Sequence, residues 1–443
     1  MAVQLSDHFT YRKLFAFVLP PIAMMILTSV YTMVDGLFVS HYVGKLAFAA
    51  VNFVFPVIIL MAGLGSMFGS GGTALVAKTL GQGAEKRAKR YFTQIIILAT
   101  VLGTIMGAVG CIWLPEICRA LGATPELLPD ALTYGRILLA FLPCCILQWT
   151  FQSLLIAAEK PKLAFWLSVA GGATNIVLDA VFMAVYGWGV AGAAWATGVS
   201  QVVAGLVPVV YFLLPNKSLL RFHRTRFQPR PMLQVCTNGA SELVSSISGA
   251  FVGMLYNYQL IRYYGEDGVA AYGVVMYVAF FFIALFIGYD MGSTPLLAYH
   301  HGAENHAELK NLFRKSISIV GTVGFTLALA AVIFAHPIAA LFVGYDESLT
   351  RLTEHAFLVY GLSFLLMGYN IFASGLFTAI NNGIISAGIS LLRTFVFQAA
   401  AVLSLPLLCG TEGIWWAVSV AEVGTLAFSV YFVLAYRKQY HYL

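Results

Sequence analysis

Charge is the first thing that this sequence of 443 residues lacks: Asp, Glu, Lys and Arg together make up only 10% of it. A soluble globular domain has about 25% charged residues, so a soluble protein is excluded. Hydrophobic residues make up 60% of the chain, and the mean hydropathy is +0.84. Composition therefore predicts a polytopic membrane protein. The long apolar runs described below predict that its fold is all-α.

Motifs of enzymes and metal centres are also missing. The six cysteines have no metal-site spacing and no nearby histidines, so neither a metal centre nor a disulfide framework is expected. The glycine-rich stretch 63–72 lacks the lysine of a phosphate-binding loop, and there is no His-Glu-x-x-His motif. Tyr289-Asp290 resembles half of an intramembrane aspartyl protease motif, but the Gly-x-Gly-Asp half is absent. We therefore expect no enzyme activity and no cofactor.

Long apolar runs fill most of the chain. A spanning helix needs about 20 mostly apolar residues, and no connection between the runs is long enough for a soluble domain. The sequence predicts twelve transmembrane helices, at 14–39, 52–77, 91–113, 133–157, 163–186, 191–214, 237–263, 268–298, 315–340, 355–380, 384–408 and 413–436.

Lysine and arginine are distributed unevenly between the two sets of connections. One set, with both termini, carries 19 of the 25 basic residues, among them Lys217 in the basic connection 215–235; the other carries 5, and Arg393 lies within a run. Cytoplasmic loops are the basic ones, so we expect both termini in the cytoplasm and the protein in the cell (inner) membrane. The basic connection is interpreted as a topology signal that also contacts anionic lipid, so no nucleic-acid partner is expected.

The second half of the sequence repeats the first. Residues 44–50 align with 265–271 and residues 192–196 with 413–417, both at an offset of 221, while 83–85 align with 302–304 at 219. This predicts an N-terminal six-helix lobe at 1–214, a linker at 215–235 and a C-terminal six-helix lobe at 236–443. Two consecutive units of six helices each insert into the membrane in the same orientation. A pseudo-two-fold axis along the membrane normal should therefore relate the lobes. Parallel repeats of this kind are typical of transporters.

Four polar residues stand out in the apolar runs of the first lobe. Asn175 and Asp179 are four apart and therefore share one face of a helix, Asp35 lies in the first run and Thr197 in the sixth. A carboxyl group in the membrane is costly and is by default a functional candidate. The alternative is a neutral Asp that only joins helices by hydrogen bonds. Two carboxylates in one cavity favour uptake of a proton or of Na⁺.

The duplication argues against a purely structural role for these acids. If packing alone required them, both lobes would have them. At the offset of 221 the second lobe instead has Tyr256 for Asp35, Val396 for Asn175 and Ala400 for Asp179.

The chain resembles the multidrug and toxic compound extrusion (MATE) family, in its bacterial drug-efflux branch. The resemblance extends over essentially the whole chain and rests on the stretch Tyr-Thr-Met-Val-Asp-Gly-Leu-Phe-Val at 31–39, Asn-x-x-x-Asp at 175–179 and Gly-Gln-Gly-Ala-Glu-Lys-Arg at 81–87. It implies that Asp35, Asn175, Asp179 and Thr197 bind the coupling cation, H⁺ or Na⁺. It also implies export of organic cations, by two lobes that alternate between inward-open and outward-open states.

Candidates in the second lobe follow the resemblance less closely. Glu242 matches an acid that some members pair with an Asp in the tenth helix, but that helix, 355–380, has no acid beyond its outer start. Asp290 is a candidate for the missing carboxylate or for binding a cationic drug. Tyr256 and Met276 are candidate drug contacts, since aromatic rings and thioethers suit flat hydrophobic cations. For Glu422 the sequence leaves two alternatives open, one of these roles or an ion pair with Arg393.

Two functions from other classes remain as alternatives. A flippase of lipid-linked saccharides has the same overall shape, but its cavity should carry several Arg or Lys to bind pyrophosphate, whereas this chain offers only Arg393. A membrane enzyme is disfavoured by the missing motifs. The preferred hypothesis is a monomeric antiporter for small cationic or amphipathic substrates.

Overall fold

The computed structural model describes residues 3–43, 45–216 and 218–443. Every regular element in these ranges is a helix, so the predicted all-α class is confirmed. Gly44, part of one repeat anchor, and Lys217, counted among the basic residues, lie outside the described residues.

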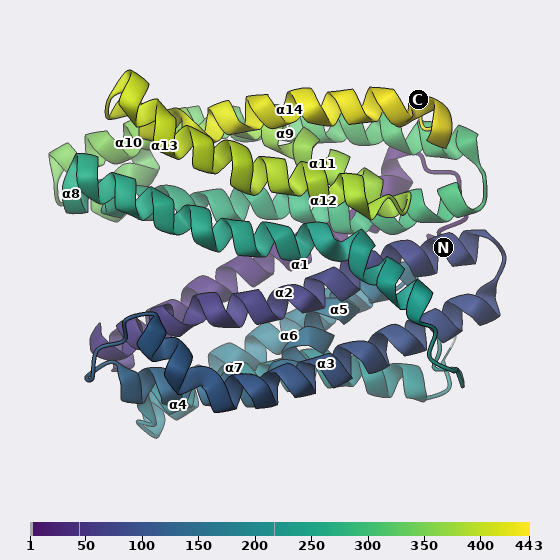
Figure 1. Ribbon diagram of the computed structural model, residues 1–443, viewed down its shortest axis with the longest axis horizontal. Helices are drawn as coiled ribbons and strands as arrows, with labels where there is room; N and C mark the ends of the chain where they lie inside the picture. The colour runs from purple at the N-terminus through teal and green to yellow at the C-terminus, as the bar shows by residue number, and fades with distance from the viewer. Residues whose placement is uncertain (1–2, 44, 217) are drawn as a thin grey trace.

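The helices form two groups, one from each half of the chain, that lie one above the other in Figure 1. The first group comprises α1 Tyr11–Phe38, α2 Lys45–Gly81, α3 Glu85–Ala120, α4 Leu128–Ala140, α5 Leu142–Ala157, α6 Pro161–Asp179 and α7 Gly189–Leu213. The second comprises α8 Pro229–Gly302, α9 His306–Val343, α10 Glu347–Gly361, α11 Phe364–Ala379, α12 Gly383–Leu391, α13 Phe397–Cys409 and α14 Glu412–Tyr440. Three short π-helices interrupt them: η1 Val39–Val43, η2 Ala180–Val185 and η3 Leu392–Val396.

Most of these helices can cross a membrane. Among the described residues 9 helices are long and apolar enough, and 2 further pairs pass the same test as bent pairs. Helix α8 has 74 residues and breaks at Gly265, where φ is 66°; at about 1.5 Å per residue it is long enough for two crossings. The polytopic class is confirmed, while the count of twelve stays a prediction.

The same bend occurs in both halves. Helices α4 and α5 meet at 56°, and α10 and α11 meet at 46°, where the sequence predicted the single helices 133–157 and 355–380. The first bend is at Phe141 and the second at Leu362, positions 221 apart. Pro143 opens α5 and cannot donate a backbone hydrogen bond to the preceding turn. The second bend has no proline, and Ser363 donates its hydroxyl to the Tyr360 carbonyl there, at 2.7 Å.

Left-handed backbone positions repeat at nearly the same offset. Gly83 and Glu304, with φ of 71° and 55°, are 221 positions apart, and Gly189 and Gly410 are also 221 apart. Positive φ marks tight turns that most residues avoid. The backbone therefore carries the internal repeat even where side chains have diverged.

Glycines bring the two groups of helices into backbone contact. A Cβ added at Gly71 of α2 would lie 2.0 Å from the Val235 carbonyl oxygen of α8, and one at Gly239 would lie 1.9 Å from the Met67 carbonyl oxygen. Only glycine allows such an approach. At Gly249, also on α8 but farther toward its break, an added Cβ would meet nothing within 4 Å.

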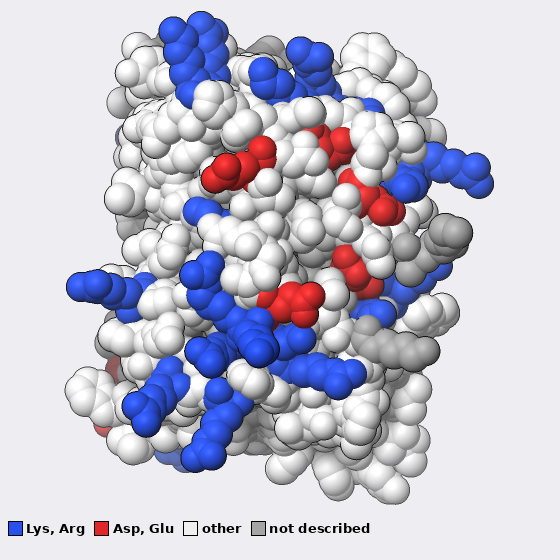
Figure 2. Space-filling model, turned by 90° about the vertical axis from the view of Figure 1, so that its right-hand side faces the viewer, with Lys and Arg blue, Asp and Glu red and all other residues white. Residues whose placement is uncertain are grey.

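The contacts between the groups lie toward one end of the molecule. In Figure 1 the groups are closest at the end that carries both termini, and they diverge toward the other end. Figure 2 looks onto the end with the termini and shows many more Lys and Arg than Asp and Glu. We call it the basic end. The concentration of Lys and Arg there matches the charge asymmetry of the sequence.

The connection between the lobes is bound to α3. The side-chain amide nitrogen of Gln94 on α3 donates to the Thr225 hydroxyl at 2.7 Å, and the side-chain oxygen of Gln94 accepts from the Gln228 backbone amide at 2.9 Å. The Phe92 and Phe222 rings are 5.5 Å apart. Helix α8 then begins at Pro229, earlier than the predicted start at 237, because proline is well suited to a first helical turn.

Candidate functional site

The four predicted residues of the first lobe come from three neighbouring helices. Asp35 lies on α1, Asn175 and Asp179 on α6, and Thr197 on α7. Helices α1 and α6 approach closely because of Gly172, where an added Cβ would lie 2.9 Å from a ring carbon of Tyr31. Small residues allow such close packing between membrane helices. This approach lets an acid from each helix occupy the same region.

Asn175 and Thr197 are in direct contact. The Asn175 side-chain amide donates to the Thr197 hydroxyl at 3.4 Å, a long hydrogen bond. Asn175 is only 4% exposed. The bond joins α6 to α7.

The Asp35 and Asp179 carboxyl groups are the unusual part of the site. Asp179 is 0% exposed. Neither of its oxygens, nor the Asp35 Oδ1 atom, has a hydrogen-bond partner among the described residues. The two groups are close enough to repel each other when both are ionised. An unpartnered buried carboxylate is costly, so the pair is satisfied best by a proton shared between them or by a bound cation.

Both acids precede a π-helix. Residues Val39–Val43 of η1 follow α1, and Ala180–Val185 of η2 begin directly after Asp179. A π-helix replaces the usual backbone ladder with weaker i to i+5 bonds and occurs often at functional sites. Hydropathy and motif spacing give no signal for it, so the sequence did not predict these segments. Both acids therefore lie next to backbone with i to i+5 bonding.

In the second lobe the structure brings Glu242 and Asp290 near each other. They lie on the two arms of α8, on either side of the break at Gly265, and Glu242 acts electrostatically on Asp290. The Asp290 Oδ1 atom is buried without a hydrogen-bond partner among the described residues. It packs on α11 at Gly375, where an added Cβ would lie 1.7 Å from it. Absence of a side chain at Gly375 therefore makes room for the carboxyl group.

The two candidate drug contacts lie in different environments. Tyr256 is only 2% exposed, and its ring stacks on Tyr272 with centroids 4.9 Å apart. Met276 is partly buried, against the hydrophobic core. Drug contact by either residue stays a prediction, and for Tyr256 it requires that the stacked pair separate or shift.

Glu422 and Arg393 form a buried ion pair, one of the alternatives left open by the sequence. Arg393 Nε donates to a Glu422 carboxylate oxygen at 2.9 Å. The other oxygen accepts from the Asn370 amide at 2.7 Å, and Ser429 donates to the Asn370 side-chain oxygen at 2.8 Å. Glu422 is 0% exposed. All three charged or amide groups are therefore bonded, in contrast to Asp35 and Asp179.

The ligand chemistry of the first-lobe site is entirely oxygen. Carboxylate, amide carbonyl and hydroxyl oxygens suit H⁺ or a hard cation such as Na⁺ rather than a transition metal. No group of three or more His, Cys, Asp or Glu able to hold a metal ion occurs in the part of the chain that the structure describes.

Comparison with known proteins gives a consistent result. The MatE family model matches residues 20–181 and 243–402, one stretch in each half. The multidrug export protein MepA of Staphylococcus aureus (strain MRSA252) is 24% identical over 414 residues, 93% of this chain and 91% of MepA. The probable multidrug resistance protein YoeA of Bacillus subtilis (strain 168) is 26% identical over 373 residues, 82% of this chain and 80% of YoeA.

A solved structure has the same fold. It is the outward-facing conformation of a multidrug resistance MATE family transporter of the MOP superfamily, with a TM-score of 0.91. The two chains are 23% identical, and the match covers 99% of each. The two-lobe arrangement of helices is therefore that of MATE transporters.

Proposed function

Because the chain belongs to the MatE family, whose members are transporters and not enzymes, we propose that it is an antiporter that exports organic cations from the cytoplasm in exchange for H⁺ or Na⁺. The observation that carries the proposal is the pair Asp35 and Asp179, in which both Asp179 oxygens and the Asp35 Oδ1 atom are buried without a hydrogen-bond partner in the described ranges. The similarity to MepA and YoeA, named as a multidrug export protein and a probable multidrug resistance protein, supports drug-like cargo.

The coupling follows from the chemistry of the pair. When a proton or Na⁺ occupies it, the repulsion between Asp35 and Asp179 is relieved and α1 can pack tightly against α6. When the ion leaves, the two carboxylates repel, and the π-helices that follow them provide backbone able to rearrange. A difference in ion affinity between two arrangements of α1 and α6 is what an ion gradient needs to drive movement.

The lobes supply the alternating access. They are in contact toward the basic end, which by the positive-inside rule faces the cytoplasm, and they diverge toward the other end. The similar solved structure is an outward-facing conformation, which supports assigning this arrangement to an outward-facing state, and the opposite motion of the lobes would open the cytoplasmic side. The protein would act as a monomer in the cell (inner) membrane, with its basic end against anionic lipid.

Charge favours cationic cargo over the flippase alternative. Arg393 is bonded to Glu422, so it is committed to an ion pair and does not offer a free cation to pyrophosphate. Asp290 has a buried oxygen without a hydrogen-bond partner in the described ranges, and Glu242 adds a second acid nearby. When ionised, two such acids in the second lobe attract a cation and repel an anion.

The first test is ethidium efflux in a host that lacks its own drug pumps. We expect Asp179→Asn and Asp35→Asn each to reduce efflux by about tenfold or more, since removal of one carboxyl removes the ion-dependent coupling. Asp267→Asn, which alters an exposed acid beside the break of α8, is the matched control and should transport normally. Full transport by Asp179→Asn would contradict the site assignment.

The second test identifies the ion. Proteoliposomes with a pH gradient and, separately, a Na⁺ gradient should show drug transport driven by one of the two gradients. Transport driven by neither gradient would refute antiport.

A further inference from the structure

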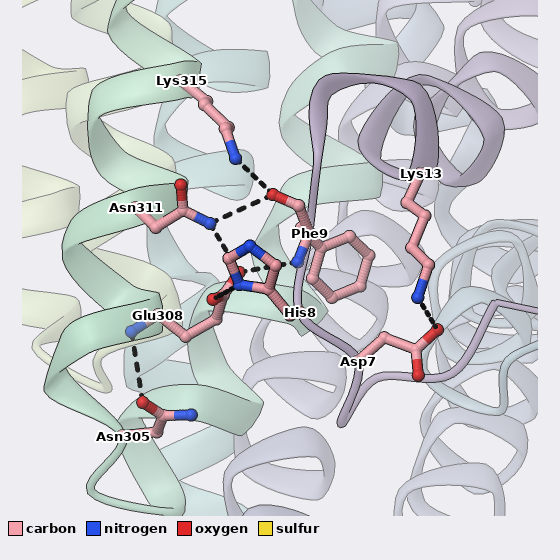
Figure 3. A network of polar contacts seen from close by, with 8 residues as sticks. All are labelled: Asp7, His8, Phe9, Lys13, Asn305, Glu308, Asn311 and Lys315. Atoms are coloured by element: carbon pink, nitrogen blue, oxygen red, sulfur yellow. Dashed lines mark hydrogen bonds and ion pairs between the residues drawn. The ribbon is translucent and has the colours of Figure 1, made fainter.

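The segment before α1 joins the two lobes at the basic end. Residues 3–10 are not helical, yet Leu5 and Phe9 are both 0% exposed. A non-helical segment with fully buried apolar side chains is fixed in place by its neighbours. We call residues 3–10 the N-terminal strap; Figure 3 shows its contacts with α9 of the second lobe.

Glu308 in the first turn of α9 is the main anchor. One carboxylate oxygen accepts from the Phe9 amide at 2.8 Å and from Asn311 at 2.7 Å, while the other contacts His8 Nδ1 at 2.6 Å. Glu308 is only 6% exposed. Its backbone is held in turn by Asn305, which caps α9 by accepting from the Glu308 amide at 3.1 Å. Two of the three groups that donate to the buried Glu308 carboxylate therefore belong to the strap.

The Phe9 residue is held on its other sides as well. Its carbonyl oxygen accepts from the Asn311 amide at 3.0 Å and from Lys315 Nζ. Its ring packs against Phe17 of α1 and His300 of α8, with centroids 6.3 Å and 6.2 Å away. The side chain thus sits between one helix of each lobe.

A second anchor lies on the first lobe. The Leu5 amide donates to a Glu159 carboxylate oxygen at 2.6 Å. Glu159 is in the tight turn between α5 and α6, where its own φ is 60°. The strap is therefore attached to the first lobe at Glu159 and through the chain to α1, and to the second lobe at α8 and α9.

We propose that the N-terminal strap is a latch that holds the two lobes together at the basic end, and that it must release from Glu308 before that end can open. This rests on the alternating access proposed above. When the lobes move apart, the strap stays with the first lobe because it continues into α1. The contacts at Glu308, Asn311 and Lys315 are then the ones that break, and Glu308 loses two of its three donors.

The test measures opening of the basic end directly. Val18 of α1 is 0% exposed and packs against α8, where a Cβ at Gly292 would lie 3.0 Å from it. In a background without the native cysteines, the thiol of Val18→Cys should react with N-ethylmaleimide only when the lobes separate. We expect Glu308→Ala, or deletion of residues 2–9, to raise the labelling rate about tenfold.

Two further variants make the result specific. His8→Ala removes one contact from a side chain that is 71% exposed, so it should fold normally and raise labelling by a smaller factor. Glu304→Gln neutralises an exposed acid just before α9 and should leave labelling unchanged.

Transport is measured on the same variants, so that failure of the latch and failure of the antiport are told apart. Faster labelling supports the latch even when no ion gradient drives transport. Unchanged labelling in His8→Ala and in the deletion variant, with the parent protein transporting normally, overturns it.

Discussion

At the scale of single residues, the buried acids of this protein differ in their hydrogen-bond partners and not in their burial. Asp179 and Glu422 are both 0% exposed. Glu422 binds Arg393 and Asn370, whereas neither oxygen of Asp179 has a hydrogen-bond partner among the described residues. A bonded acid holds one structure in place, while an acid without fixed partners can exchange a proton or ion. Mutation of Glu422 should therefore affect the stability of the structure, whereas mutation of Asp179 should affect exchange of a proton or ion.

Replacement of Glu422 tests the structural half of this contrast. Glu422→Ala leaves the Arg393 charge, whose side chain is 16% exposed, without its carboxylate partner, while the Asn370 amide keeps the backbone carbonyl oxygen of residue 422 as an acceptor. We expect the substitution to lower the free energy of unfolding by about 3 kcal/mol. Glu422→Gln should cost less because an amide oxygen can still accept from Asn370. Denaturant unfolding in detergent micelles measures both.

The control for this measurement is on the same helix. Glu412→Ala removes an exposed contact with His355, which as a surface pair is worth at most about 1 kcal/mol. If Glu422→Ala were no more destabilising than this control, the buried ion pair would not hold α14 to its neighbours.

The sequence was sufficient to select the candidate residues of the first lobe but not to describe how they are arranged. Asp35 and Asp179 could be selected because charge is scarce in apolar runs and because the second lobe has no acid at these positions. The pairing of Glu422 with Arg393 was one alternative among several, since a distance of 29 positions in the sequence does not specify which side chains meet. The π-helix after each Asp depends on tertiary packing, and hydropathy contains no information about it.

At the scale of helices, the connection between the lobes is a fixed element and not a loose linker. Leu220 is 0% exposed, and His223 donates its backbone amide to Thr93 of α3 at 3.0 Å. The bonds of Gln94 to Thr225 and Gln228 extend this attachment to the start of α8. Any hinge between the lobes must therefore lie at or beyond Gln228.

Gln94→Ala tests this attachment. It removes two hydrogen bonds from a side chain that is only 2% exposed, a loss of about 1–2 kcal/mol. The connection should open locally, so trypsin cleavage after Arg221, Arg224 or Arg226 should become about 5–30 times faster.

Gln82→Ala is the control for that experiment, because the Gln82 side chain is exposed and, among the described residues, accepts a hydrogen bond only from Arg87. It should leave the cleavage rate unchanged. Equal rates in the wild type and in Gln94→Ala would mean that the connection is held by its buried apolar residues instead.

The bend between α4 and α5 could not be predicted from hydropathy. The apolar run from 133 to 157 continues without interruption through the bend at Phe141, so hydropathy predicts one helix. Hydropathy measures transfer into lipid and is insensitive to the direction of the axis. Pro143, two positions after the first bend, is a local signal for that bend. The bend recurs at Leu362, one repeat later, where no proline marks it in the sequence.

At the scale of the whole molecule, the proposed alternating access would depend on the contact between helices α2 and α8. Helices α2 and α8 meet through glycines whose missing side chains bring the backbones together toward the basic end, as at Gly71 and Gly239. Such contacts cost little to break in lipid, since no large apolar surface between helices drives them. Glycine at these positions therefore permits a closed basic end that can also open.

Gly239→Ala is the decisive substitution for this idea. Its Cβ would lie 1.9 Å from the Met67 carbonyl oxygen, a distance that requires backbone movement, so the observed closed contact cannot form unchanged. We expect the lobes to separate at the basic end and approach at the opposite end. Spin labels at Leu121, directly after α3, and at Tyr345, between α9 and α10, would occupy exposed positions of the first and second lobes. The connections that follow α3 and α9 lie at that opposite end in Figure 1, so the two labels should move closer together.

Gly249→Ala distinguishes a shift between states from a general effect of alanine in α8. It makes the same chemical change on the same helix, where an added Cβ would meet nothing within 4 Å, and should leave the label distance unchanged. Drug efflux should fall in Gly239→Ala alone, because a transporter held in one state cannot complete its cycle. A normal label distance together with normal efflux in Gly239→Ala would show that closure of the basic end does not depend on this glycine contact.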